Sequence, residues 1–284
     1  IKSTMKTKKI LLLALIAMML TSCVSTSYFQ VYKTVPSDKL VVKDNLLVYE
    51  DENCKVSYNL WGEGGNIGFQ FFNKTDKNIY LNLEESFFIL NGISYNYYRN
   101  RVFTNSTSSG ATTSRGATAT KSVTGLNYLD LIQTNRISAT NTVGILTSSG
   151  FSVSYNEEKI ICIPSKTSKI ISEYNINESL FRDCDLFKYP TKKQIKSKTF
   201  SKEQSPLVFS NRIAYSIGQT DNLIKFENEF YVTEISNYPE SEMFESKYDE
   251  YCGQKSMTMT KYFKNVSADK FYIKYSKGQD IWKH

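Results

Sequence analysis

The sequence CKVSYNLW, residues 54 to 61, has an apolar residue at every second position for four cycles. This period of two predicts a strand with one buried face, because successive side chains of a strand point to opposite faces. Gly62-Glu63-Gly64-Gly65 then predicts a turn, since residues 67–72 alternate again. A phosphate-binding glycine loop would instead open a helix. We therefore expect two neighbouring antiparallel strands here.

Strand patterns of this kind continue along the chain. Asn91-Gly92 lies between two apolar runs and is the strongest two-residue hairpin signal. Regular helices between the strands are missing, which argues against a parallel α/β fold. The sequence predicts a mainly β protein, an antiparallel β-sandwich that is immunoglobulin-like or similar. Further strands are expected at 46–50, 79–83, 87–90, 93–98, 159–163, 170–174, 207–209, 212–217, 224–226, 230–235, 257–263 and 271–275.

Two short helices are expected beside these strands. Phe244, Tyr248 and Tyr251 recur at three- and four-residue spacing within 240–251, which is typical of one helix face. Residues 180–186 form the second candidate.

Residues 104–150 differ in composition from the rest, because Ser, Thr, Gly and Ala dominate most of the segment. A flexible loop, a small-residue hairpin that packs against a partner and a hairpin that enters a membrane all fit this composition. The small apolar side chains bury little area, which counts against membrane insertion. We expect one domain over 40–284 with this segment as an insertion.

The N-terminal residues have the pattern of a lipoprotein signal peptide. Three lysines precede the apolar run Ile10 to Leu20, whose eleven residues would cover roughly 16 Å as a helix, about half of a bilayer core. Leu20-Thr21-Ser22-Cys23 then matches a lipobox, an aliphatic and two small residues before the cysteine that takes the lipid. We expect residues 1–22 to be removed, Cys23 to be lipidated, and 23–39 to serve as a tether.

Lipidation predicts a membrane-anchored protein, because several acyl chains hold a protein on a bilayer firmly. Val24 stands where an Asp would indicate retention in the inner membrane, and the residues after it form no acidic cluster of the kind that signals export to the cell surface. The expected location is the cell envelope, on the outer membrane and facing the periplasm.

Removal of residues 1–22 takes away four lysines and no acidic residue, so the formal net charge falls from +7 to +3. We see no polybasic block in the mature chain that could neutralise many phosphates at once. A nucleic-acid partner is therefore not expected.

Four cysteines remain after Cys23, an even number that allows disulfides in an oxidising compartment. We favour a disulfide between Cys184 and Cys252, because both lie in polar, turn-like sequence. Cys54 and Cys162 lie within strand patterns, where two buried thiols and a second disulfide are equally compatible with the sequence.

The only histidine is His284, so a hydrolase triad built on imidazole and a histidine-ligated metal have no support. We expect no catalytic residue, no metal and no cofactor. Paired acids leave a carboxylate-based hydrolase as an alternative, although the acidic run at 240–250 fits a solvated helix face better. The candidate acids are Glu84, Glu85, Asp183, Asp185, Glu240, Glu242, Glu245, Asp249 and Glu250.

Aromatic residues are abundant and could form a platform for sugars, with core packing as the simpler explanation. Alternation places Tyr58 in the core and puts Trp61 and Tyr80 on the opposite face, where they would be available. Trp282 is the other tryptophan. Glycan binding is therefore an alternative function.

The lipobox, the segment Asn73-Lys74-Thr75-Asp76-Lys77-Asn78-Ile79-Tyr80 and the segment Ile161-Cys162-Ile163-Pro164 together resemble lipoproteins of gut Gram-negative anaerobes with a β-rich domain of unknown function. The resemblance covers most of the mature chain. It implies an envelope location and a sandwich fold, and it supplies no catalytic residues. The leading hypothesis is a non-enzymatic lipoprotein that binds or scaffolds a protein partner.

Overall fold

The structure is a computed structural model that describes residues 26–37, 39–109 and 149–278. Its larger sheet contains β1 Ser27–Pro36, β6 Ile79–Asn82, β7 Phe87–Leu90, β8 Ile93–Asn96, β11 Ile160–Ile163, β13 Ser197–Thr199, β14 Val208–Ile217, β15 Ile224–Pro239 and β18 Lys270–Ser276. The main path is β11-β6-β14-β15-β1-β18, with β13 beside β15, and with β7 beside both β14 and β8.

A second sheet has the order β12-β5-β4-β3-β2, formed by β2 Leu40–Lys43, β3 Leu46–Glu50, β4 Cys54–Tyr58, β5 Phe69–Asn73 and β12 Ser168–Ile171. Two separate hairpins consist of β9 Val102–Ser109 with β10 Ser149–Asn156, and of β16 Phe244–Tyr251 with β17 Gln254–Phe263. The described helices are η1 Lys192–Gln194 and α2 Glu240–Met243. The prediction of a mainly β, antiparallel, sandwich-like fold is confirmed.

Aromatic rings from the two sheets meet in the core. Tyr58 of β4 packs edge-on against Phe230 of β15, with ring centroids 5.3 Å apart. Tyr49 of β3 stacks on the half-buried Phe226, also of β15, at 4.5 Å. Tyr58 and Phe230 are fully buried, and burial of such a side chain stabilises a fold by about 1.5–3 kcal/mol. The expectation that Tyr58 lies in the core is confirmed.

The predicted tether over 23–39 is wrong for most of its length, because residues 27–36 form β1 between β15 and β18. Tyr32 is fully buried and stacks on Phe271 of β18, with ring centroids 4.6 Å apart. Its hydroxyl donates to Gln30 at 2.5 Å, and burial raises the pKa of Tyr32 to about 12. The strand β1 therefore begins at Ser27, four positions after Cys23.

The predicted helix over 240–251 is also wrong beyond its first turn. Only Glu240–Met243 is helical, and the chain continues as β16 to Tyr251. A four-residue spacing such as that between Phe244 and Tyr248 keeps side chains on one face of a strand as well as of a helix. The second helix expected at 180–186 is an irregular segment that ends in a turn.

The hairpin prediction at Asn91-Gly92 is confirmed, since β7 and β8 pair directly across these two residues. Both residues have positive φ, 48° and 81°, as a two-residue hairpin turn requires. The glycine segment at 62–65 also joins two antiparallel strands, β4 and β5, although through a wide loop. In this loop Gly64 donates its backbone N–H to the Tyr272 carbonyl of β18 at 2.8 Å.

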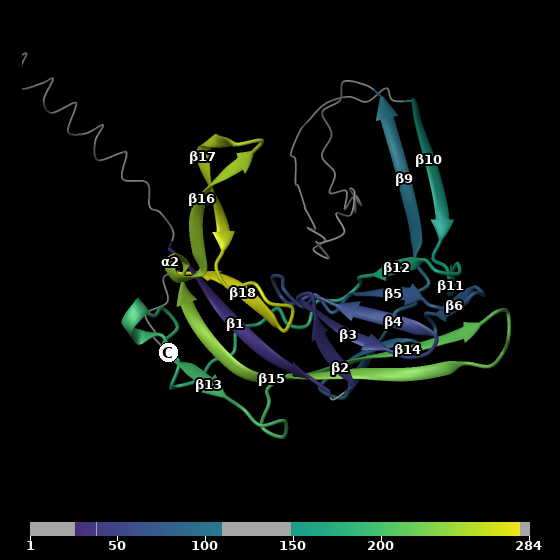
Figure 1. The fold of residues 1–284 in the computed structure, drawn as a ribbon, viewed down its shortest axis with the longest axis horizontal. Helices are drawn as coiled ribbons and strands as arrows, with labels where there is room; N and C mark the ends of the chain where they lie inside the picture. The colour runs from purple at the N-terminus through teal and green to yellow at the C-terminus, as the bar shows by residue number, and fades with distance from the viewer. Residues whose placement is uncertain (1–25, 38, 110–148, 279–284) are drawn as a thin grey trace, which may run out of the picture.

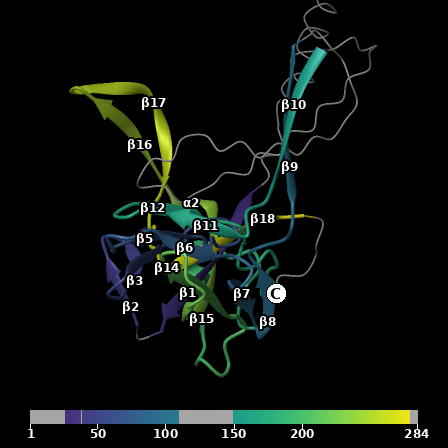
Figure 2. The same cartoon turned by 90° about the vertical axis from the view of Figure 1, so that its right-hand side faces the viewer.

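The two separate hairpins, β9–β10 and β16–β17, rise from the same side of the body (Figure 1). The view turned by 90° shows the same arrangement, with the hairpins well apart (Figure 2). The strand β15 runs the length of the body, from the β14–β15 turn at one end to α2 at the other (Figure 1). The start of β1 lies at the α2 end, because Tyr28 pairs with Pro239.

Candidate functional site

The hairpin β16–β17 is fixed to the body by aromatic rings at its root. Phe244 and Phe263 form the first cross-strand pair, with ring centroids 4.3 Å apart. Both rings contact Phe29 of β1, at 5.3 and 6.1 Å, and Phe263 also packs on Trp61 at 5.2 Å. Met243 of α2 is buried in the same cluster. The hairpin therefore starts from a packed base.

Beyond this root, the two faces of the hairpin differ in chemistry. Tyr248 pairs with Met259, and Met257 follows two positions earlier in β17, next to the register shift of the hairpin. On the opposite face the Thr260 hydroxyl donates to Asp249 at 2.5 Å, the Tyr262 hydroxyl donates to the same carboxylate, and these bonds hold the pKa of Asp249 below its ordinary value. The face with Tyr248 and Met259 carries the large apolar side chains, together with Ser246 and Lys261, and the opposite face is polar. We call Tyr248, Met257 and Met259 the apolar face.

The apolar face is open to solvent. Met257 is fully exposed, Met259 is 56% exposed and Tyr248 is 48% exposed, while Tyr251 at the tip is 84% exposed. A two-stranded hairpin is marginally stable alone in water, and an exposed group of apolar side chains is typical of an interaction site. Methionine adapts its shape to different partners because its side chain is unbranched and polarisable. The hairpin can therefore gain stability from contact with a partner.

The root of the other hairpin, β9–β10, is fixed by charge. The Arg101 guanidinium forms ion pairs with Glu157 and, at 2.7 Å, with Glu173. Burial opposes ionisation of Glu157, but hydrogen bonds from Arg101 and from the backbone N–H of Arg99 hold its pKa below the ordinary value. The hairpin is thus held at its base by a half-buried network of charges. The root remains charged over the ordinary physiological pH range.

A hollow of about 590 Å³ lies at the end of the body opposite α2. Its volume is in the range of small-molecule sites. Among its lining residues Tyr80 alone is aromatic, and Asn82, Cys162 and Asp221 supply polar groups. Tyr80 is half-buried. The hollow is thus open and lined by both apolar and polar groups, with one ring against which a ligand could stack.

The structure does not form the predicted disulfide between Cys184 and Cys252, since both are free, exposed thiols. Cys252 lies in the β16–β17 turn, and Cys184 lies in the irregular segment before β13. Cys54 is a buried free thiol whose pKa is raised by burial, and Cys162 is exposed. Residues 1–22, Cys23, most of the 104–150 insertion, Trp282 and His284 lie outside the described residues.

Most of the candidate acids form ion pairs with lysines at the surface. Glu84 pairs with Lys159, Glu85 with Lys225, Glu240 with Lys261, Glu242 with Lys192, and Glu245 with Lys247, while Asp183 and Asp185 share Lys198. Asp249 accepts the two hydroxyl bonds described above. In the described part of the chain, no group of three or more acidic, cysteine or histidine side chains is arranged to hold a metal ion. In the described structure, most of these acids are therefore partners of surface lysines.

The expectation that Trp61 is available is wrong, because it is only 4% exposed within the root cluster. The Asn59 side chain accepts a hydrogen bond from the Trp61 backbone at 3.0 Å, so the chain turns after Tyr58 and the alternation ends. Tyr80 lines the hollow, as described above. The apolar face of β16–β17 was not predicted from the sequence, although Gly253 is a turn signal between the two strands.

No family model matches the chain, and neither the curated proteins nor the solved structures include a similar one. Among the described residues, no helix combines the length and the apolar character needed to cross a bilayer.

Proposed function

We propose that this chain is a non-enzymatic lipoprotein of the cell envelope that is anchored through Cys23 and binds a protein partner. The observation that carries the partner assignment is the β16–β17 hairpin, which projects from the body with Tyr248, Met257 and Met259 exposed on one face. Partner contact would bury this face and complete a two-stranded unit that has little stability alone.

The anchor part of the proposal rests on the lipobox. Cys23 follows the apolar run and two small residues, the order that a lipoprotein signal requires. The resemblance to lipoproteins of gut Gram-negative anaerobes implies an envelope location. Val24 and the lack of an acidic cluster after it favour the outer membrane and a position facing the periplasm. An anchored protein meets its partners within the envelope. A hairpin that projects from the body is in a position to bind such a partner.

Glycan binding is the weaker alternative. It depends on the hollow, where Tyr80 is half-buried and is the one ring among the lining residues. Sugar sites commonly use aromatic faces, and Trp61 is withdrawn into the root cluster. The exposed aromatic and methionine side chains are concentrated on the hairpin instead.

The partner proposal is tested by crosslinking in intact cells. A photoreactive residue at position 251 is expected to give an adduct of defined mass, because Tyr251 is at the exposed tip. The triple substitution Y248S/M257S/M259S should weaken that adduct roughly tenfold or more, since interface anchors of this kind contribute about 2 kcal/mol.

The matched control changes the other face. Glu245→Gln with Lys247→Gln removes an exposed ion pair on the polar face of the same strand and should leave the adduct intact. Equal adduct yields from the triple variant and the control would show that the apolar face binds no protein. Circular dichroism confirms that both variants keep the fold.

A further inference from the structure

The end of the fold that carries Ser27 must lie close to the membrane if Cys23 is acylated, so this inference rests on the proposed function. Ser27 follows Cys23 by four positions, and an extended chain of that length spans at most about 14 Å. β1 starts directly at Ser27 and is held by β15 and β18. The short connection therefore keeps the surface around this end close to the bilayer.

This end of the fold carries a lysine-rich segment that the small net charge of the mature chain does not reveal. Residues 186–200 contain five lysines and no acidic residue. Lys192, Lys193 and Lys196 are exposed. Lys192 reaches Glu242 of α2 at 3.1 Å, which places the segment beside α2. We call residues 188–196 the lysine segment.

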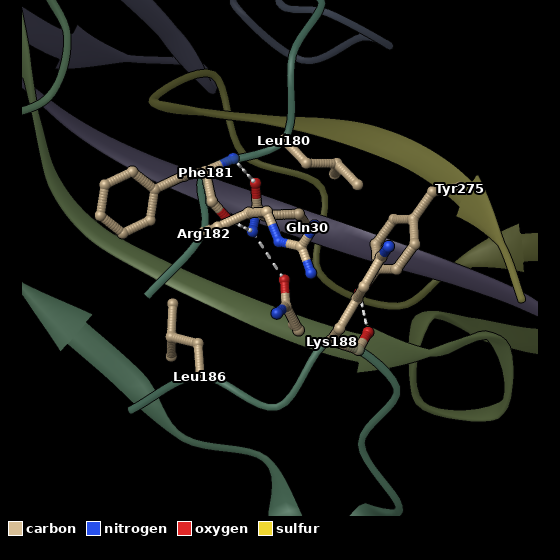
Figure 3. A pocket seen from close by; sticks show the side chains of 8 residues that line it. Gln30, Leu180, Phe181, Arg182, Leu186, Lys188 and Tyr275 are labelled. Carbon is tan, nitrogen blue, oxygen red and sulfur yellow. Dashed lines mark hydrogen bonds between the residues drawn. The ribbon is translucent and has the colours of Figure 1, made fainter. Parts of the chain in front are cut away.

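Hydrogen bonds fasten the chain that leads into the lysine segment to β1, β15 and β18 (Figure 3). The Gln30 side chain of β1 accepts the backbone N–H of Phe181 at 2.7 Å and donates to its carbonyl at 2.8 Å. The Tyr275 hydroxyl of β18 donates to the Lys188 carbonyl at 2.5 Å. Asn237 of β15 donates to the Phe187 carbonyl at 3.0 Å. The backbone at the start of the lysine segment is therefore fixed to the body.

Little space remains underneath these contacts. The cavity lined by Gln30, Phe181, Lys188 and Tyr275 measures about 10 Å³, room for a single water molecule. The lysine segment is therefore a surface and not the wall of a small-molecule pocket.

Tyrosines lie directly beside the lysines. Tyr189 packs against Tyr28 of β1, with ring centroids 5.2 Å apart, and against Tyr275 at 6.1 Å. Tyr28 is buried, whereas Tyr189 and Tyr275 are half-buried. Tyrosine and lysine are the residues that favour the boundary between lipid headgroups and water.

We propose that the lysine segment binds the anionic headgroups of the bilayer that holds the acyl chains, and so fixes the orientation of the body on the membrane. Lipid is favoured over a second protein because the anchor brings this end, and not the β14–β15 end, to the bilayer. Charge complementarity points the same way, since basic residues next to a membrane bind anionic phospholipid.

The test uses the mature chain from residue 23 with Cys23→Ser, so that no acyl group contributes to binding. Co-flotation is measured with vesicles of phosphatidylglycerol and phosphatidylcholine, and with phosphatidylcholine alone. K192Q/K193Q/K196Q is expected to lower the partition coefficient on the anionic vesicles roughly a hundredfold, about fivefold per lysine. The matched control K43Q/K77Q/K169Q loses the same charge at exposed positions elsewhere and should keep most of the binding.

Equal loss in the triple variant and the control would overturn the proposal, because net charge alone would then explain binding. Absence of binding by the Cys23→Ser chain to anionic vesicles would also overturn it. If the variant keeps its vesicle binding and instead loses a crosslinked protein in cells, the segment is a protein site and the lipid assignment is wrong. Flotation of the acylated chain on neutral vesicles reports the anchor separately, so the two proposals can fail independently.

Discussion

Replacement of Tyr32 by Ala is expected to lower the free energy of unfolding by about 4 kcal/mol, the usual cost of deleting a large buried aromatic side chain. Tyr32 has no exposed surface, and its ring lies parallel to that of Phe271. The substitution leaves a cavity between β1 and β18 and removes a hydroxyl that bonds Gln30. Urea unfolding followed by circular dichroism measures the change.

Two further variants separate the loss of ring packing at Tyr32 from the loss of its hydrogen bond and from substitution on β1 in general. Tyr32→Phe keeps the ring and should cost only about 1–2 kcal/mol for the lost hydrogen bond. Val35→Ala changes a side chain that is 36% exposed on the same strand and should cost less than Tyr32→Ala by a wide margin. A Tyr32→Ala chain as stable as the parent would mean that 27–36 is a tether after all.

Gly65→Ala is expected to lower the free energy of unfolding by about 3 kcal/mol. Gly65 has a φ of +75°, where an L side chain costs roughly 1–2 kcal/mol. A Cβ atom there would also lie 2.8 Å from the Ile176 side chain and 2.8 Å from the Phe271 ring, both in the core. Overpacking of this kind typically adds about 1–3 kcal/mol.

Gly253 provides the matched control, because its φ of +77° is nearly the same and a Cβ atom there would meet nothing within 4 Å. Gly253→Ala should therefore cost only the backbone part, about 1 kcal/mol. Thermal unfolding of the two variants isolates the packing part as their difference. Equal losses at the two positions would contradict the close approach of the glycine loop to β18.

Most of the sandwich could be predicted because its strands alternate cleanly. β3 and β7 have the bounds that the pattern indicates, and the Asn91-Gly92 turn follows from backbone geometry that few residues tolerate. β1 could not be predicted because several of its buried side chains are polar. Gln30 and Thr34 are 1% exposed, and hydrogen bonds to distant segments satisfy them. A pattern of apolar and polar residues does not show which buried polar side chains have hydrogen-bond partners.

The candidate surface was harder to predict than the fold. Phe244 and Tyr248 fit a helix and a strand equally well, and only pairing with β17 decides between the two. The lysines of the lysine segment can be counted in the sequence. The proposed role in lipid binding depends on the position of the segment beside the start of β1, which the sequence does not give. That position is set by contacts such as the one between Tyr275 and Lys188, which join residues 87 positions apart. Long-range packing of this kind leaves no local pattern.

The proposed function requires a lipid on Cys23, four positions before the start of β1. Mass spectrometry of the N-terminal peptide from the membrane-extracted protein detects this lipid. We expect Cys23 to be the first residue and to carry a thioether-linked diacylglycerol with a further acyl group on its amine. An unmodified Cys23, or a peptide that still contains residues before it, would show that the protein has no such anchor.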